Sequence, residues 1–295
     1  MLYGILYAIV ILAMSPLVAG IIKTAKARLQ NRRGASPLQP YFDLAKLFRK
    51  GSVVSPTTSW IFRAAPYVYF AAAAAAAGMA AAGQFGSVAD MLLLIYIYGL
   101  GRFFLALASL DAGSAFGGMG GSREMYISVL VEPALLLALL TVAGPAGTTS
   151  LAGMAGAAAG APLAFSYILA AIAFFVVLIA ETGRIPVDNP DTHLELTMVH
   201  EGMVLEYSGR QLGLIHWASM IKQLTVLALF VVYFIPWGVP GLPAMIGGPV
   251  FAVKVLAAAL FLALAETSTN KMRLFRLPGF LAVSCLLSLL ALVAQ

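Results

Sequence analysis

Residues 163–180 read LAFSYILAAIAFFVVLIA, an uninterrupted apolar stretch without a charged side chain. A helix needs about 20 apolar residues, within a range of about 17–25, to cross the hydrocarbon core of a bilayer. Comparable runs recur along the chain at 2–22, 66–83, 90–110, 126–143, 163–180, 218–236, 249–266 and 278–293. The sequence therefore predicts an all-α polytopic membrane protein, with about eight transmembrane helices in a single transmembrane domain over residues 1–295.

Composition supports this fold class and limits the chemistry of the chain. Hydrophobic residues make up 61% of it and charged residues 10%, whereas a soluble domain carries roughly 25% charged residues. The single cysteine, Cys285, cannot form an internal disulfide or a cysteine-ligated iron–sulfur site. His193, His200 and His216 follow no zinc-binding spacing. We therefore expect no cofactor bound by this chain, and we assign redox metal chemistry to partner subunits.

The basic residues gather in alternate loops. The loop 23–65 holds nine of them. The loops after the third, fifth and seventh predicted spans hold Arg123, Arg184, Arg210, Lys271, Arg273 and Arg276. The loops 84–89, 144–162 and 237–248 hold none, so the positive-inside rule places the basic loops in the cytoplasm and both termini outside the cell (inner) membrane. Topology thus explains the net charge of +6, and no nucleic-acid partner is expected.

An amphipathic pattern lies within the first cytoplasmic loop. Its apolar stripe consists of Leu38, Tyr41, Phe42, Ala45 and Phe48, and its polar side carries Asp43, Lys46 and Lys50. This pattern predicts a helix that lies in the membrane interface. Two hypotheses follow, a surface anchor or one wall of a site at the interface.

Several ionisable residues fall within or at the ends of predicted spans. They are Arg102, Glu132, Lys222, Lys254 and Glu266. A charge at the bilayer centre costs about 2.5–3.5 kcal/mol on translocon scales, so such residues usually have a function. Arg102 and Glu132 lie roughly 12 Å and 9 Å from the cytoplasmic ends of consecutive spans, at 1.5 Å per residue. They can pair if these spans are neighbours, either as a structural ion pair or as part of a proton or ion relay.

The cytoplasmic loop 181–217 holds half of the chain's twelve carboxylates. They are Glu181, Asp188, Asp191, Glu195, Glu201 and Glu206. Pro186 and Pro190 favour irregular backbone, and the chain is expected to return to a helix from Asp191 or Thr192 onward. The residues leave three hypotheses open: a carboxylate funnel that feeds protons inward, a docking surface for a cytoplasmic partner, or a metal site.

A glycine-rich stretch, GSAFGGMGGS (113–122), precedes the fourth predicted span. Glycine-rich loops can hold a phosphate when they connect a strand to a helix. No strand precedes this stretch, so we predict a flexible loop.

Two stretches carry a resemblance to a known family. They are RRGASPLQPYFDLAKLFRK (32–50) and ETGRIPVDNPDTHLELTMVHEGMVLEYSG (181–209). Together with the span count and orientation, they resemble the membrane subunit shared by respiratory complex I, where it forms the heel under the quinone chamber, and energy-converting nickel–iron ([NiFe]) hydrogenases. The residues that match the complex I pattern are Glu181, Arg184, Pro186, Asp188, Pro190, Glu195, Glu206, Tyr207, Ser208 and Gly209.

Other features look like the hydrogenase branch of this family, as in formate hydrogenlyase. These are DNPDTHLELTMVHE (188–201) and GGMGGSREM (117–125). His193 also stands where complex I usually has a carboxylate. The resemblance therefore favours the hydrogenase branch over a quinone headgroup site.

The resemblance implies a non-catalytic subunit of an oxidoreductase complex. Such a subunit anchors a peripheral arm with the [NiFe] centre and iron–sulfur clusters, and its buried carboxylates begin the path that couples redox change to proton or sodium movement. The implied pathway residues are Glu132, Glu181, Glu195, Glu201 and Glu206, to which the intramembrane charges add Arg102 and Lys222. The residues expected to orient the loop or contact a partner are Arg184, Asp188, Asp191, His193, Met198 and Met203.

The implied partners are the hydrogenase large and small subunits, iron–sulfur subunits, antiporter-like membrane subunits and the lipid bilayer. Our leading hypothesis is the membrane anchor and ion-coupling subunit of a membrane-bound [NiFe] hydrogenase or formate hydrogenlyase. The alternatives are the quinone-site subunit of a complex I-like NADH dehydrogenase, with quinone as ligand, and a purely structural anchor. A stand-alone transporter is disfavoured because the chain has no internal repeat and its helix breaks lie at the membrane edge rather than the midplane.

Overall fold

The computed structural model describes residues 2–82, 89–160, 165–190, 198–238 and 244–294. Within these ranges the helices are α1 (Leu2–Leu29), α2 (Gln39–Arg49), α3 (Trp60–Ala82), α4 (Met91–Asp111), α5 (Ala115–Ala146), α6 (Leu151–Gly160), α7 (Phe165–Glu181), α8 (His200–Val204), α9 (Gly209–Phe234), α10 (Ala244–Ser268) and α11 (Leu277–Val293). A short 3-10 helix (Leu274–Arg276) precedes α11. The predicted all-α fold is confirmed.

Seven of the described helices are long and apolar enough to cross a membrane, namely α1, α3, α4, α5, α9, α10 and α11. The apolar helix α7 has 17 residues, at the lower limit of the length that spans a bilayer. The first two residues of the span predicted there, 163 and 164, lie outside the described part of the chain. The count is therefore near the predicted eight.

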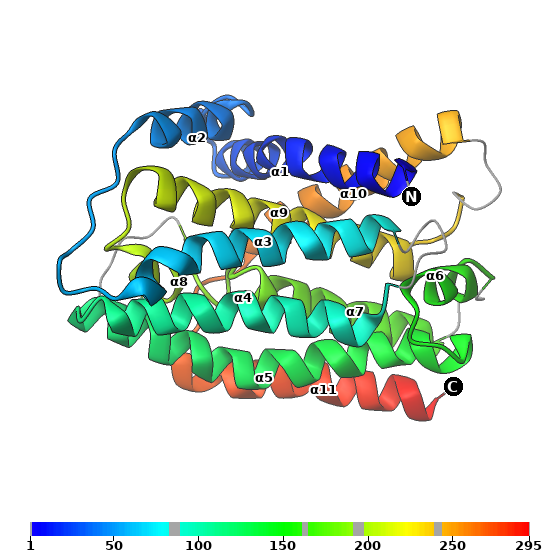
Figure 1. The fold of residues 1–295 in the computed structure, drawn as a ribbon. Helices are drawn as coiled ribbons and strands as arrows, with labels where there is room; N and C mark the ends of the chain where they lie inside the picture. Colours follow the sequence, from blue (N-terminus) through cyan, green and yellow to red (C-terminus); the bar gives the residue numbers. More distant parts are fainter. Residues whose placement is uncertain (1, 83–88, 161–164, 191–197, 239–243, 295) are drawn as a thin grey trace.

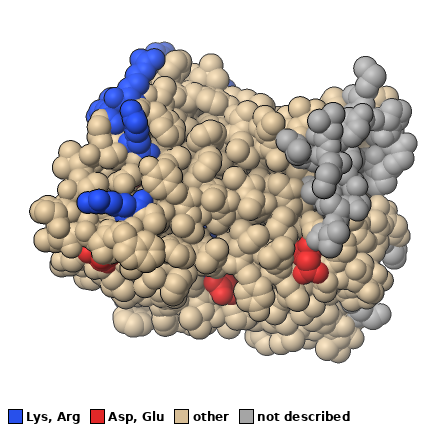
Figure 2. Space-filling view, viewed as in Figure 1, with Lys and Arg blue, Asp and Glu red and all other residues tan. Residues whose placement is uncertain are grey.

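The long helices lie side by side in one bundle (Figure 1). Its centre is α9, which contacts α1, α3, α7 and α10 and is buried along most of its length. The helices α2 and α8 lie toward one end of the bundle, and the two marked chain ends lie toward the other (Figure 1). Figure 2 shows basic residues gathered at the end that holds α2 and α8. Which side of the membrane this end faces stays a prediction.

The glycine-rich stretch 113–122 is not the flexible loop that we predicted. The helix α5 begins within it, and the Ser114 hydroxyl caps the helix by accepting a hydrogen bond of 3.1 Å from the Gly117 N–H. A Cβ on Gly120 would lie 2.9 Å from the carbonyl oxygen of Val199, just before α8. The physical reason for this glycine is therefore close contact between backbones, which a side chain would prevent.

The helix predicted in the first loop is present as α2. Its buried Leu44 faces the bundle, and Phe48 lies edge-on to Trp217 of α9, with 6.2 Å between the ring centroids. Leu38 and Phe42 remain exposed. The apolar stripe is thus divided between contacts with the bundle and an open surface, as suits a helix in the membrane interface.

Candidate functional site

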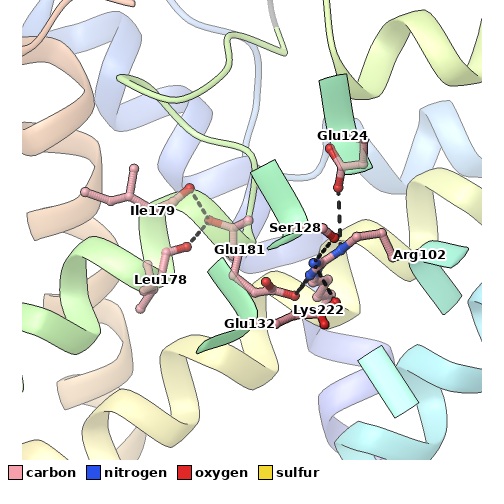
Figure 3. A network of polar contacts seen from close by, with 9 residues as sticks. Arg102, Glu124, Ser128, Glu132, Leu178, Ile179, Glu181 and Lys222 are labelled. Carbon is pink, nitrogen blue, oxygen red and sulfur yellow. Dashed lines mark hydrogen bonds and ion pairs between the residues drawn. The ribbon is translucent and has the colours of Figure 1, made fainter. Parts of the chain in front are cut away.

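A buried arginine, Arg102 of α4, organises the candidate site (Figure 3). Its Nη1 lies 2.7 Å from Ser128 Oγ and 3.2 Å from Glu132 Oε1. Its Nη2 donates a hydrogen bond to Glu181 Oε1, and its Nε lies 3.6 Å from Glu124 Oε1. A guanidinium carries five N–H donors in a rigid plane, so this one side chain can hold several carboxylates at once.

Lys222 of α9 supplies a second cation. Its Nζ lies 2.7 Å from Glu181 Oε1 and 5.6 Å from the centroid of the Tyr98 ring. The Glu181 carboxylate has no exposed surface and lies between Lys222 and Arg102. We name the five ionisable residues of this network, Arg102, Glu124, Glu132, Glu181 and Lys222, the Arg102 cluster.

Four helices bring these side chains together. Glu124, Ser128 and Glu132 follow one another at four-residue spacing along α5, which places them on one face of that helix. The neighbouring helix α4 contributes Arg102, α7 ends at Glu181, and α9 contributes the lysine. The contact expected between Arg102 and Glu132 is present. Sequence analysis missed Glu124 and Ser128, although their spacing from Glu132 was a usable signal.

A cavity of about 390 Å³ adjoins the Arg102 cluster and reaches the segment 182–190. Its charged and histidine lining residues are Lys23, Arg102, Glu124, Glu181, Arg184, Asp188, His200, Glu201, His216 and Lys222. A cavity that holds water needs polar groups in its lining, and these side chains supply them. The cavity is therefore suited to a hydrated connection between the carboxylate-rich loop and the buried cluster.

The loop after α7 is held against α10 and the segment that follows it. The Asp188 carboxylate lies 2.7 Å from Lys271 Nζ and accepts a hydrogen bond of 3.1 Å from the His200 N–H. The Met272 N–H donates a hydrogen bond of 2.8 Å to the carbonyl oxygen of Pro186. These contacts place Asp188 where it can orient the loop, the role that sequence analysis expected of it.

Arg184 connects the same loop to a second buried ion network. Its Nη2 donates a hydrogen bond of 2.6 Å to Gln223 Oε1 on α9, and its Nη1 lies 3.7 Å from Glu266 Oε1 on α10. The Glu266 carboxylate is fully buried and lies 2.5 Å from Lys26 Nζ of α1. Sequence analysis identified Glu266 as an intramembrane charge but did not find its partners, because they lie on helices distant in the chain.

The remaining predicted site residues of the loop differ in their surroundings. Glu201 lines the cavity, whereas Glu206 is exposed and does not line it. Met198 and Met203 are almost fully buried within the bundle, so they form no exposed apolar surface for a partner. This contradicts the partner-contact alternative for both methionines, and their burial beside α5 explains the apolar character of the segment.

Three predicted residues, Asp191, His193 and Glu195, lie outside the described part of the chain, as does the start of the helix expected from Asp191. Lys254 lies apart from the Arg102 cluster. Its Nζ donates a hydrogen bond of 2.8 Å to the carbonyl oxygen of Ile235, at the end of α9. Lys254 therefore caps a helix end.

Tyr207 fixes the connection between α8 and α9. Its ring stacks on that of Phe62 at 4.0 Å between centroids, and its hydroxyl donates a hydrogen bond of 2.9 Å to the Phe62 carbonyl oxygen. Burial and the nearby carboxylate of Asp111 raise the pKa of Tyr207 well above its usual value. The phenol therefore keeps its proton at neutral pH and serves as a hydrogen-bond donor.

The described residues offer no group of three or more His, Cys, Asp or Glu side chains placed to hold a metal ion. Cys285 is a free thiol on α11. The buried carboxylates of the two networks are already paired with lysine and arginine side chains. Both networks therefore hold ionised side chains that compensate one another's charge inside the bundle.

The residues that form the site belong to a chain whose whole length matches one family. Residues 2–295 match the family described as NADH dehydrogenase. The chain belongs to this family. A solved structure of the membrane-bound sulfane sulfur reductase, an archaeal respiratory membrane complex, shares the NADH dehydrogenase family fold seen here. A chain of that structure aligns with this chain at a TM-score of 0.86 and 22% sequence identity, and the alignment covers 100% of this chain and 99% of the chain in the solved structure.

Curated relatives within the NADH dehydrogenase family fall into two groups. Formate hydrogenlyase subunit 4 of Escherichia coli (strain K12) is 38% identical over 284 residues, which cover 92% of this chain and 91% of the relative. Hydrogenase-4 component C of the same organism is 36% identical, covering 80% and 76%. An NADH-quinone oxidoreductase subunit of Syntrophotalea carbinolica is 28% identical, covering 82% and 76%. The resemblance found in the sequence is thereby confirmed.

Proposed function

We propose that this chain is the membrane anchor and ion-coupling subunit of a membrane-bound [NiFe] hydrogenase or formate hydrogenlyase complex. The kind of complex is supported by the identities of 38% and 36% to the hydrogenase-type relatives, against 28% to the NADH-quinone oxidoreductase relative. One observation carries the coupling role. A cluster of five ionisable residues, of which Arg102, Glu181 and Lys222 are buried, adjoins a cavity with many charged lining residues that reaches the carboxylate-rich loop.

The unequal charges of the Arg102 cluster allow it to take up a proton. Three carboxylates face two cations, so the cluster within this chain carries a net negative charge, which favours the uptake of a proton. An arginine keeps its proton in a protein, so the possible proton carriers of the cluster are its three carboxylates and Lys222. Glu124 lines the cavity, and Glu132 contacts Arg102 from a separate recess. Glu124 is therefore the carboxylate placed to take up a proton from the cavity, and Glu132 is the one placed to exchange a proton with the separate recess.

The partner-facing surface would lie at the end of the bundle that holds α8. Leu205, Glu206 and Arg210 are exposed there. The Val53 N–H of the first loop donates a hydrogen bond of 2.8 Å to Ser208 Oγ, which joins the two predicted cytoplasmic loops into one surface. In this proposal the surface binds the hydrogenase large and small subunits and their iron–sulfur subunits. Antiporter-like membrane subunits would lie beside the bundle, and both chain termini would lie outside the cell membrane.

The proposal is tested by measuring proton movement in inverted membrane vesicles that contain the whole complex. Glu124→Gln and Glu132→Gln should leave the peripheral subunits bound while lowering the number of protons moved per turnover at least tenfold. Asp43→Asn is the matched control, because Asp43 is an exposed carboxylate of α2 outside the cavity. Parent-level proton movement by both glutamine variants in fully assembled complexes would contradict the coupling role.

The cavity also favours a second candidate, the quinone-site subunit of a complex I-like dehydrogenase. Tyr69 and His200 both line it, with 6.4 Å between their ring centroids, and such rings can hold a planar headgroup. This function predicts that His200→Ala raises the quinone concentration needed for half-maximal turnover. A turnover that proceeds without quinone in parent and variant would exclude it.

A further inference from the structure

Glu132 has an unusual position for a charged residue of a membrane helix. Its side chain is 44% exposed, and it opens into a recess of about 380 Å³ between α4 and α5. The recess is separate from the larger cavity, and Arg102 lines both. Arg102 therefore divides an inner, polar space from an outer one that faces away from the bundle.

The surface around the recess is apolar. Leu100, Phe103 and Met125 line it, and the side chains of Tyr96 and Val129 beside it are 73% and 69% exposed. In the view of Figure 2, the middle of the molecule is almost free of charge apart from small acidic patches. The helices α4 and α5, which border the recess, are both long and apolar enough to cross a membrane. Without a partner protein, lipid would therefore cover the face that these two helices form. A half-exposed carboxylate facing lipid is strongly unfavourable unless a second group pairs with it.

The charges of the Arg102 cluster indicate what this second group is. Lys222 and Arg102 both contact Glu181, and Glu124 lines the inner cavity. In the described part of the chain, the ion pair of Glu132 is with Arg102 alone, which it shares with two other carboxylates. In the described residues the cluster has one carboxylate more than it has cations, and Glu132 is the carboxylate that a positive charge outside the bundle can reach.

The recess also has room for an incoming side chain. Gly99 lies on α4 directly beside Glu132, and a Cβ added at this glycine would come within 3.5 Å of Glu132 Oε1. Any longer side chain at position 99 would extend into the recess and cover the carboxylate. The glycine thus keeps the approach to Glu132 open from the outer surface.

We propose that the α4–α5 face binds a transmembrane helix of another membrane subunit of the complex, and that a lysine or arginine of that helix enters the recess and pairs with Glu132. The inference rests on the proposed function only in placing the chain in a complex with further membrane subunits. The partner is defined by its chemistry, an apolar helix with one basic side chain at the depth of Glu132. Such a helix would cover the exposed aromatic side chains and place a positive charge beside Glu132.

A photo-crosslinking experiment on the whole complex in its native membrane tests the contact. A photoreactive amino acid replaces Tyr96 or Val129, and the matched control replaces Leu286, which is 59% exposed on α11, a helix without charged residues. We expect adducts from both α4–α5 positions with a membrane subunit, mapped by mass spectrometry to a helix that contains a lysine or arginine, and lipid adducts from the control. Lipid adducts alone from Tyr96 and Val129 in an assembled complex would overturn the proposal, as would a crosslinked helix without a basic residue.

Charge reversal tests the pairing itself. Glu132→Lys should lower the amount of the crosslinked membrane subunit that co-purifies at least tenfold, because two positive charges would then face each other. Replacing the partner's basic residue with glutamate should restore co-purification in the double variant, which also shows that the Glu132→Lys chain folds. Failure of the double variant to restore it would overturn the pairing. The crosslinking and co-purification experiments do not depend on proton movement, so the docking proposal and the coupling role can fail independently.

Discussion

Replacing Glu181 with glutamine removes the carboxylate that lies between Lys222 and Arg102 while it preserves the size of the side chain. Arg102 keeps its contacts with Glu124 and Glu132. Lys222 loses the carboxylate with which it forms its ion pair in the described part of the chain, and its ammonium group stays buried. The variant therefore leaves the Lys222 charge unpaired and also removes one of the contacts of Arg102.

The expected effect follows from the distance and the burial. The two charges lie 2.7 Å apart, which at an effective dielectric constant of about 20 corresponds to an attraction of about 6 kcal/mol before desolvation is subtracted. Removing one partner of a buried pair costs about 3–5 kcal/mol, so Glu181→Gln should lower the free energy of unfolding by this amount. In Glu181→Gln/Lys222→Met both charges are gone, and the loss should fall to about 1–2 kcal/mol.

The free energies of unfolding are measured for parent, both single variants and the double variant by titrating the purified subunit from mild detergent into a denaturing one. The double-mutant cycle then gives the interaction energy between Glu181 and Lys222. We expect about 2 kcal/mol or more. An interaction energy below about 0.5 kcal/mol, with all four proteins folded, would refute the claim that this contact is a buried ion pair of structural importance.

Three further predictions concern the backbone, pH and topology. Gly209→Ala should destabilise the protein by about 1–3 kcal/mol, because the residue has φ +53° and an added Cβ would clash with the carbonyl oxygen of Gly51 in the first loop. The control, Gly118→Ala, places its Cβ in open space and should be neutral or slightly stabilising. Thermal unfolding measures both. The Thr149 hydroxyl donates a hydrogen bond that lowers the pKa of Asp90. The ionised Asp90 should therefore stabilise the fold fully above about pH 4, and this stabilisation should be lost as the pH falls through the lower pKa of the folded state. Asp90→Asn should remove this part of the acid dependence of the unfolding temperature. In a cysteine-free background, an impermeant thiol reagent applied to intact cells should label Ser150→Cys but not Ser36→Cys, and the reverse pattern would overturn the predicted orientation.

The number of spans could be predicted from the sequence because lipid imposes a length on each apolar run. The Arg102–Glu132 contact could be predicted for a related reason. The depth of a residue in a helical span follows from its position in the sequence, at 1.5 Å per residue, and these two residues lie at similar depths in consecutive spans. Glu181 was identified as one of several loop carboxylates, yet its pairing with Lys222 depends on α7 and α9 lying side by side. Nothing in local sequence specifies which distant helices are neighbours, so that part of the site was beyond prediction.

The two wrong expectations have the same physical origin. Glycine composition at 113–122 resembles that of a flexible loop, but at Gly120 the absence of a side chain allows α5 to approach the backbone before α8. Met198 and Met203 were expected to orient the loop or contact a partner, but their side chains fill the interior of the bundle beside α5 and are not available to a partner. In both cases, contacts with segments distant in the sequence determined the local structure or the burial of the residues. The local composition of a segment is a weak predictor of either when such contacts are present.

The loop between α7 and α8 has a mechanical consequence. Glu181 ties its beginning to α4 and α9, and Asp188 ties it again to Lys271 beyond α10, with the backbone bond from Met272 to Pro186 between them. Residues 181–188 are thus held at two points, and a segment held in this way transmits a displacement instead of absorbing it. A force applied to this segment from outside the bundle would act on the end of α10 through Lys271 and on α4 through the Arg102 guanidinium, so both helices would be displaced together.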